Sequence, residues 1–173
     1  MPWAKLYAVA ATKILRRLLL LPYQVFAALL FLMLLLLSVP ASFVAGLRDP
    51  RGDRAHRCLT YWARANLVLA GLRVKVEGLD RLDPKAAYVF MPNHASFLDI
   101  LLTLAYVPYN FRMITKEEMF VIPLVGWLLR RSGQIPLNRK SPRKGLRSLE
   151  LAGRLIAEGI SVVVFPEGTR TTN

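Results

Sequence analysis

Thirty consecutive residues, Leu18 to Leu47, carry no charged side chain, and this run constrains the fold more than any other feature of the sequence. A helix needs roughly 20 apolar residues to cross the hydrocarbon core of a bilayer, so the run is long enough to do so. A removable signal peptide fits poorly because the apolar region is too long, although small residues near Ala41 keep that alternative open. The run therefore predicts an N-terminal membrane segment.

Basic side chains flank this run on both sides. They are Lys5, Lys13, Arg16 and Arg17 before it, and Arg48, Arg51, Arg54 and Arg57 after it. Lysine and arginine concentrate on the cytoplasmic side of a membrane, and one straight span cannot place both flanks there. We therefore expect a re-entrant helical pair, broken near Pro40, that anchors residues 18–47 at the cytoplasmic face. A single tilted span is the alternative.

Charge and apolar content narrow the class of partner. The formal net charge is +13, and 54% of the residues are hydrophobic. This combination points to an anionic membrane surface, whereas nucleic-acid-binding modules interleave basic and aromatic residues on a polar chain. The single cysteine, Cys58, excludes an internal disulfide and fits a reducing compartment. One cysteine and two histidines also argue against a dedicated zinc site.

The sequence pattern changes after residue 71. Residues 1–71 are expected to form the membrane-associating segment and an amphipathic connecting helix (residues 51–71), and residues 72–173 an α/β domain with a mixed open sheet flanked by helices. Alternation of Val74, Val76 and Leu79 with charged residues predicts a first strand with one wet face. Further strands are expected at residues 86–91, 111–115, 133–139 and 161–165, a helix at 97–106, and two short helical pieces between 116 and 131.

The last predicted helix has clear end signals. Ser141 and Pro142 are typical of an N-cap and a first helical position, and Gly159 is typical of a helix end. Apolar residues at helical spacing predict its buried stripe. The stripe consists of Leu146, Leu149, Ala152, Leu155 and Ile156.

A polar stretch, Asn93 to Asp99, lies between the predicted strand that Pro92 ends and the helix that follows. Open α/β sheets bind ligands at the carboxyl ends of their strands. His94 suits general-base work near neutral pH, and a carboxylate at Asp99 can orient one ring nitrogen while the other takes a proton from a substrate hydroxyl. The second histidine, His56, lies among arginines and is given no role.

Two other interpretations of this stretch stay open. Ser96 and Asp99 match the S-x-x-D capping pattern, in which Asp99 accepts a hydrogen bond from the Ser96 backbone N–H at a helix start. Capping and catalysis are compatible, since a capped helix fixes the carboxylate. Ser96 as the nucleophile of a hydrolase is a more distant alternative, because no G-x-S-x-G turn surrounds it.

A second strand–proline–polar stretch, Phe165 to Arg170, repeats this geometry. Arg170 offers a planar fork suited to phosphate, and Gly168 permits close backbone approach. Arg139 and Lys116 also follow predicted strands, so their side chains can point into a site. The other basic residues between 119 and 149 are expected to form a solvated or membrane-facing surface.

Taken together, these stretches resemble the PlsC-type glycerolipid acyltransferase family, which includes lysophosphatidic acid acyltransferases. The N-H-x-S-x-x-D pattern is met by residues 93–99, and a glycine-led strand ending in arginine by Gly133 to Arg139. F-P-E-G-T-R is met in full by Phe165 to Arg170. Three blocks in order are specific, whereas any one alone is weak.

The resemblance implies a reaction and a set of roles. His94 would take the proton from the hydroxyl of 1-acyl-sn-glycerol 3-phosphate or another lysophospholipid as it attacks an acyl thioester on coenzyme A or acyl carrier protein, and Asp99 would orient His94. No metal, cofactor, nucleic acid or covalent acyl-enzyme is implied. The implied acceptor-binding residues are Lys116, Arg139, Glu167, Gly168, Thr169 and Arg170.

The family's pattern continues beyond the F-P-E-G-T-R block, whereas this sequence stops at Asn173. The C-terminal part of the fold is therefore expected to be missing, which would leave the strand before Pro166 as an uncovered apolar edge. The alternative function is a non-catalytic membrane-surface protein that binds anionic lipid through its basic residues.

Overall fold

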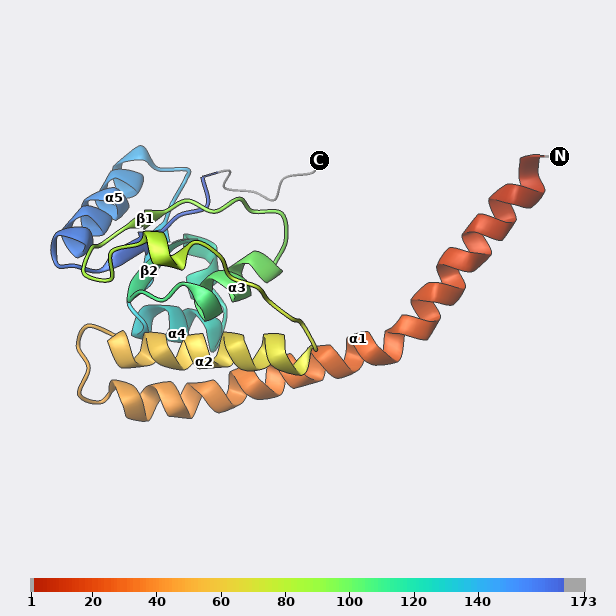
Figure 1. Cartoon of the computed structure of the whole chain (residues 1–173), viewed down its shortest axis with the longest axis horizontal. Helices are drawn as coiled ribbons and strands as arrows, with labels where there is room; N and C mark the ends of the chain where they lie inside the picture. Colours follow the sequence, from red (N-terminus) through yellow and green to blue (C-terminus); the bar gives the residue numbers. More distant parts are fainter. Residues whose placement is uncertain (1, 167–173) are drawn as a thin grey trace.

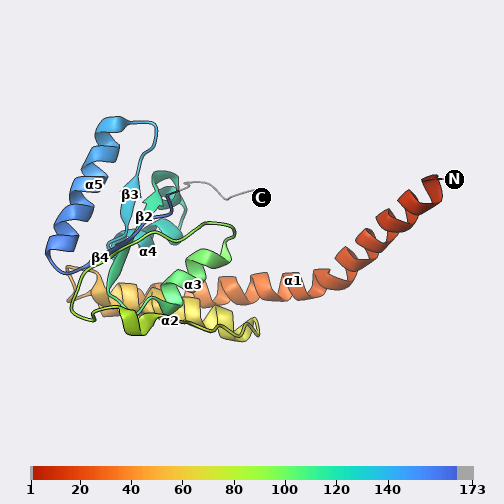
Figure 2. The same cartoon turned by 45° about the horizontal axis from the view of Figure 1, so that its top comes forward.

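The structure is a computed structural model, which describes the backbone of residues 2–166 and the side chains of Leu15 and residues 19–166. Two helices begin the chain, α1 (Pro2–Gly46) and α2 (Asp53–Leu69), and they pack against each other along α2 (Figure 1). The amphipathic connecting helix is thus present. The N-terminal part of α1 bends and leaves the body of the molecule in both views (Figures 1 and 2).

The helix pair is not formed at Pro40, so the predicted break there is wrong. α1 runs without interruption through Pro22 and Pro40 and ends at Gly46. A proline removes one helical hydrogen bond, but Phe31, Leu35 and Val39 pack against the core and hold the turns on its N-terminal side in place. The segment Leu19–Gly46 contains an 18-residue window with a mean hydropathy of 2.5, of which 17% is buried, so by length and composition the segment could cross a membrane.

The sheet has four described strands in the order β1-β4-β2-β3, and every pair is parallel where a mixed sheet was expected. The strands are β1 (Val89–Phe90), β2 (Phe111–Lys116), β3 (Ile135–Leu137) and β4 (Ser161–Val163). β4 lies between β1 and β2, and its three residues are buried. The expectation of an exposed apolar edge at this strand is therefore wrong, because β4 is an inner strand.

Helices cover the two faces of the sheet unequally. Phe111, Met113 and Val163 pack on one face with α2, α3 (Leu98–Tyr106) and α4 (Val125–Arg131). Alternate strand residues such as Ile114 and Val162 face α5 (Pro142–Ala157) on the other side. Figure 1 shows this order, with α1 and α2 below the sheet and α5 above it. The α/β class is thereby confirmed.

The predicted strand after residue 71 is absent. Residues 72–78 form no strand and are followed by a short 3₁₀ turn, Leu79–Arg81. The alternating pattern is present, but a strand also needs a backbone partner, and no described segment pairs with this one.

α5 begins as predicted, with the Ser141 hydroxyl accepting a hydrogen bond from the Lys144 N–H (3.4 Å). Its predicted buried stripe is partly wrong, since Leu146 and Leu149 are 58% and 59% exposed. Ala152, Leu155 and Ile156 of the predicted stripe do pack against the sheet, and Ser148, which the stripe did not include, is buried beside them. Hydrophobic spacing predicts that one face of a helix is buried, but it does not fix how that face is rotated towards the sheet.

Candidate active site

The carboxyl ends of the four strands meet at one edge of the sheet because the strands are parallel. β1 leads at this edge to His94, β2 ends at Lys116, and β3 ends two residues before Arg139. β4 leads to Phe165, whose ring centroid lies 4.5 Å from that of His94. The fold therefore gathers the described residues that follow these strands at one rim.

His94 and Asp99 contact each other across the loop that joins β1 to α3. His94 Nδ1 lies 3.3 Å from Asp99 Oδ2, and both side chains are largely shielded from solvent. A carboxylate at this position favours the proton on Nδ1 and makes Nε2 the basic nitrogen. The pair therefore has the geometry of a general base and its orienting carboxylate.

The Asp99 carboxylate also holds the start of α3. Its Oδ2 accepts hydrogen bonds from the backbone N–H groups of Ala95 (2.7 Å) and Ser96 (2.6 Å). Burial raises the pKa of Asp99, but the hydrogen bonds from Ser96, Ala95 and His94 together outweigh it and hold the pKa below its ordinary value. Capping and the contact with His94 thus coexist in one ionised side chain.

The Ser96 hydroxyl makes its hydrogen bonds within the loop. It accepts a hydrogen bond from the Leu98 N–H (3.1 Å) and lies 3.4 Å from Asp99 Oδ1. A serine nucleophile needs its base within hydrogen-bond reach, and here the contacts of Ser96 are with the cap of α3. The local geometry therefore favours a positioning role over that of a nucleophile.

A second network of polar side chains connects the ends of β2 and β3. The Glu117 carboxylate accepts hydrogen bonds from Asn138 Nδ2 and, at 3.1 Å, from Lys144 Nζ. These contacts with Lys144 and Asn138 lower the pKa of Glu117. Asn138 Oδ1 in turn accepts hydrogen bonds from the backbone N–H groups of Lys140 (2.9 Å) and Ser141 (3.0 Å). This network fixes the turn that carries Arg139.

Sequence reasoning missed Glu117 and Asn138, because their contact depends on the register of β2 and β3. Each directly follows a residue at the end of a strand, and the register pairs Lys116 with Leu137, which brings the next two residues side by side. Lys116 itself is exposed and lies 3.3 Å from Glu118. The other predicted acceptor-binding residues, Glu167, Gly168, Thr169 and Arg170, lie outside the described residues.

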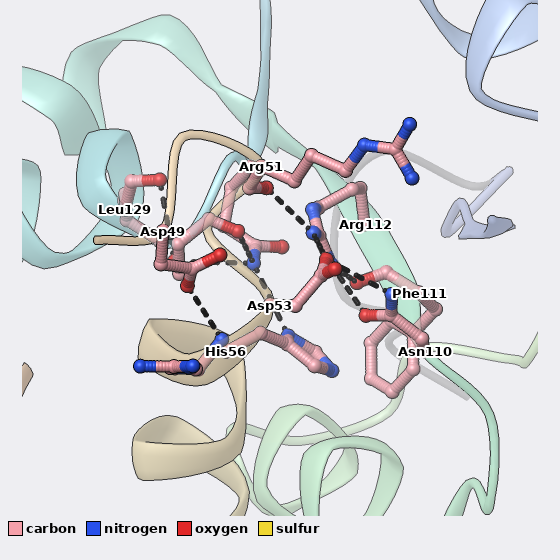
Figure 3. Close-up of polar contacts among 11 residues, drawn as sticks. Asp49, Arg51, Asp53, His56, Asn110, Phe111, Arg112 and Leu129 are labelled. Carbon is pink, nitrogen blue, oxygen red and sulfur yellow. Dashed lines mark hydrogen bonds and ion pairs between the residues drawn. The ribbon is translucent and has the colours of Figure 1, made fainter. Parts of the chain in front are cut away.

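A buried polar cluster lies at the other end of β2 (Figure 3). Arg112 is 1% exposed and its guanidinium donates hydrogen bonds to Asp53, to Asn110 Oδ1 (2.8 Å) and to the Arg51 carbonyl (2.8 Å). His56, 3% exposed, packs edge-on against Phe111 with ring centroids 4.5 Å apart. This cluster connects the turn between α1 and α2 to the sheet and lies away from the rim that carries His94.

Comparison with known protein families identifies the family of this chain. The sequence profile described as Acyltransferase matches residues 73–173, which is more than half of the chain. The protein therefore belongs to the Acyltransferase family, and the predicted family resemblance is confirmed.

Individual relatives are similar over both the helices and the α/β part. The chain is 38% identical over 127 residues to a chloroplastic 1-acyl-sn-glycerol-3-phosphate acyltransferase of Arabidopsis thaliana, covering 71% of this chain and 35% of the relative. It is 32% identical over 143 residues to 1-acyl-sn-glycerol-3-phosphate acyltransferase alpha of Mus musculus, covering 82% and 49%. The chain thus spans about a third to a half of these curated relatives.

A solved structure has the same fold. The crystal structure of PlsC, the 1-acyl-sn-glycerophosphate acyltransferase of Thermotoga maritima, superposes with a TM-score of 0.69 at 26% identity. The match covers 92% of this chain and 64% of the other. The arrangement of α1, α2 and the sheet described above is therefore shared with that enzyme.

Proposed function

We propose that the protein transfers a fatty acyl group from an acyl thioester to the free hydroxyl of 1-acyl-sn-glycerol 3-phosphate, giving phosphatidic acid. The observation that carries this proposal is the His94–Asp99 pair at the carboxyl rim of the sheet, in a chain similar to enzymes named for this reaction. The donor is a thioester of coenzyme A or of acyl carrier protein.

In the proposed reaction, His94 Nε2 takes the proton of the acceptor hydroxyl as its oxygen attacks the thioester carbonyl. The tetrahedral intermediate collapses, the C–S bond breaks, and the proton on His94 passes to the departing sulfur. Asp99 holds the imidazole and stabilises its protonated form while the proton is in transit. General-base help of this kind contributes roughly 10²–10⁴-fold to the rate.

The acceptor phosphate is proposed to bind between the strand ends. Arg139 and Lys116 follow the adjacent strands β3 and β2, and Arg170 and its neighbours follow β4 in sequence. Guanidinium groups bind phosphate oxygens through paired hydrogen bonds, which suits the headgroup of a lysophospholipid. Glu167 would orient an arginine, and Gly168 and Thr169 would permit close approach and donate a hydrogen bond.

Membrane attachment through α1 is part of the proposal. The exposed apolar side chains of Leu19–Gly46 would anchor the chain, with the α/β part on the cytoplasmic side. Figure 1 shows the free part of α1 and the loop between β1 and α3 extending to the same side of the molecule. A lysolipid that diffuses in the bilayer would therefore reach His94 without leaving the membrane surface.

The test is acyl transfer by the full chain in detergent micelles, with labelled palmitoyl-CoA and lysophosphatidic acid. His94→Ala is expected to lower kcat by roughly 10²–10⁴-fold while liposome association and the unfolding temperature stay unchanged. An unchanged rate in this variant removes His94 as the base. If the unmodified chain binds anionic liposomes in a salt-dependent way but turns over no donor, the non-catalytic alternative replaces the proposal.

A further inference from the structure

A cavity of about 550 Å³ lies near the amino ends of the strands, away from His94. It is lined by one face of α2, by the turn between α3 and β2, and by two side chains of residues 72–79. Asn110 in this lining immediately precedes β2, whereas Lys116 ends β2 at the rim that carries His94. The six residues of β2 span about 16 Å at 3.3 Å per step. The cavity, called the α2 cavity below, is therefore separate from the candidate active site.

Two arginines lie on the face of α2 that lines the α2 cavity. Arg57 and Arg64 are seven positions apart, about two turns of the helix, so they share one face. The Arg64 guanidinium donates a hydrogen bond to the Ala105 carbonyl (3.0 Å) and lies over the ring of Tyr106, 5.5 Å from its centroid. Arg57 is exposed, and no ion pair within the described residues includes it. One cation is thus held against the wall, and the other extends into solvent beside it.

The acidic side chain of the lining, Asp53, is already paired. It binds the buried Arg112 guanidinium and accepts a hydrogen bond from Asn110 Nδ2 (2.9 Å), as Figure 3 shows. Because the charges of Asp53 and Arg112 offset each other, Arg57 and Arg64 leave the α2 cavity positively charged. A phosphate monoester, with close to two negative charges and several acceptor oxygens, suits two guanidinium groups better than a single carboxylate does.

The other walls of the α2 cavity are largely apolar and aromatic. Tyr61 of α2 and the side chains of Val76 and Leu79 line it and are exposed. Residues 72–79 alternate like a strand but pair with no described strand, and they run back along α2 (Figures 1 and 2). This segment therefore presents apolar side chains to the cavity rather than to a neighbouring strand. An apolar part of a ligand would cover them.

From these observations we infer that the α2 cavity binds a small organic phosphate, that is, a phosphate group on an apolar or aromatic body. Ligand cavities typically measure roughly 300–1,000 Å³, and this one lies within that range. Arg57 pairs with the phosphate through its planar fork, and Arg64 adds a fixed positive charge. The body of the ligand covers Tyr61 and Leu79. Because the site is separate from the His94 rim, the inference does not depend on the proposed reaction.

The experiment measures the binding of 1-naphthyl phosphate to the full chain in a non-ionic detergent, by the fluorescence of the naphthyl group. Inorganic phosphate lacks the ring and 1-naphthol lacks the charge, so each should bind at least about tenfold more weakly. Arg57→Glu should raise the Kd at least about tenfold at low salt, and the effect should shrink as salt screens the charges. Arg54→Glu makes the same charge change on the same helix outside the cavity lining, and this control should leave the Kd unchanged.

Leu79→Ser tests the apolar wall independently of charge. The side chain is exposed, so its loss leaves the core intact and should raise the Kd for 1-naphthyl phosphate about threefold. The Kd for inorganic phosphate should not change. Two competitors then identify the source of the phosphate. Displacement by adenosine monophosphate assigns a nucleotide, and displacement by dihexanoyl phosphatidic acid assigns a lipid headgroup.

Several results overturn the inference, and none of them depends on turnover. They are no binding by the unmodified chain, equal Kd values in Arg57→Glu and Arg54→Glu, and displacement by neither competitor. A loss in Lys116→Glu equal to that in Arg57→Glu would place the bound phosphate at the rim with His94 and also overturns it. So does a result in which Arg57→Glu loses affinity for anionic vesicles and not for 1-naphthyl phosphate, which would assign this face of α2 to the bilayer.

Discussion

At the scale of single residues, the site depends on carboxylates that each bind more than one partner. Asp99 contacts His94 and accepts two backbone hydrogen bonds at the start of α3, and Glu117 binds Asn138 and Lys144 at the ends of neighbouring strands. Local sequence spacing reveals the first of these, because His94, Ser96 and Asp99 lie within six residues. It cannot reveal the second, because Glu117 and Asn138 are 21 residues apart and meet only through the strand register.

Asp99→Asn tests the orienting role. The amide keeps the size of the side chain but loses the charge that stabilises protonated His94, so kcat should fall by at least about 10²-fold with little change in KM. The measurement is steady-state acyl transfer from palmitoyl-CoA, with Asp80→Asn as the control at an exposed carboxylate. A variant that keeps its rate would show that Asp99 serves only as the helix cap.

Glu117→Ala tests whether the network at the strand ends positions Arg139. Removing the carboxylate frees Asn138 and Lys144, so the turn at Arg139 loosens and KM for lysophosphatidic acid should rise about tenfold with kcat changed less. Glu77→Ala, at an exposed ion pair with Lys75, is the matched control. Glu117→Gln keeps an acceptor for Asn138 and should restore part of the affinity. Equal effects on KM for acceptor and donor would contradict this role.

At the scale of the elements, local signals predicted what local forces determine. The cap of α5, the strands at β1, β2 and β4 and the amphipathic α2 all follow from turn residues and periodicity in the sequence. The predictions were wrong where contacts with distant parts of the chain determine the structure. Residues 72–78 have no partner strand, and α1 continues through Pro40 because it is packed against the core. α5 exposes Leu146, which was expected to be buried.

Gly126→Ala tests whether α4 depends on close packing against a neighbouring segment. A Cβ at Gly126 would lie 2.0 Å from the Phe120 carbonyl oxygen, so the start of α4 would have to move away from the 3₁₀ turn Glu117–Val121 that precedes it. We expect a loss of about 1–3 kcal/mol in the free energy of unfolding. Gly153→Ala is the control, because a Cβ there meets nothing within 4 Å and alanine favours the helix by up to about 1 kcal/mol. Equal stability of the two variants in thermal unfolding would contradict the close packing of α4.

At the scale of the whole molecule, the buried cluster around Arg112 joins the N-terminal helices to the sheet. The guanidinium reaches the turn after α1 through Arg51 and Asp53, and Gln134 accepts the Met113 N–H (2.7 Å) while its amide nitrogen lies 3.5 Å from His56 Nδ1. Sequence reasoning gave Arg112, Gln134 and His56 no role, because an arginine inside a predicted strand indicates burial only when its partners are known. The division of the chain after residue 71 stays a prediction, and α2 shares its core with α3 and the sheet.

His56 makes the stability of this assembly depend on pH. Burial, with a further contribution from the positive charge of Arg112, lowers the pKa of His56 from 6.5 to about 4, against the opposing effect of Asp53. Below pH 6.5 His56 binds a proton in the unfolded chain but stays neutral in the folded chain. The stability that depends on neutral His56 is therefore fully present above pH 6.5 and is lost as the pH falls towards 4. The full loss is about 3 kcal/mol, since one pKa unit corresponds to about 1.4 kcal/mol.

His56→Gln removes this titration and keeps a polar group beside Gln134. Its own cost in stability is the same at every pH, so the quantity to measure is the difference in unfolding free energy between pH 7 and pH 4.5. We expect that difference to shrink by about 2–3 kcal/mol relative to the unmodified chain. His94→Gln, at the more accessible histidine, serves as the control and should retain most of the difference. If His56→Gln keeps the full pH dependence, the acid sensitivity arises elsewhere, and His56 is not held neutral by the cluster that joins the helices to the sheet.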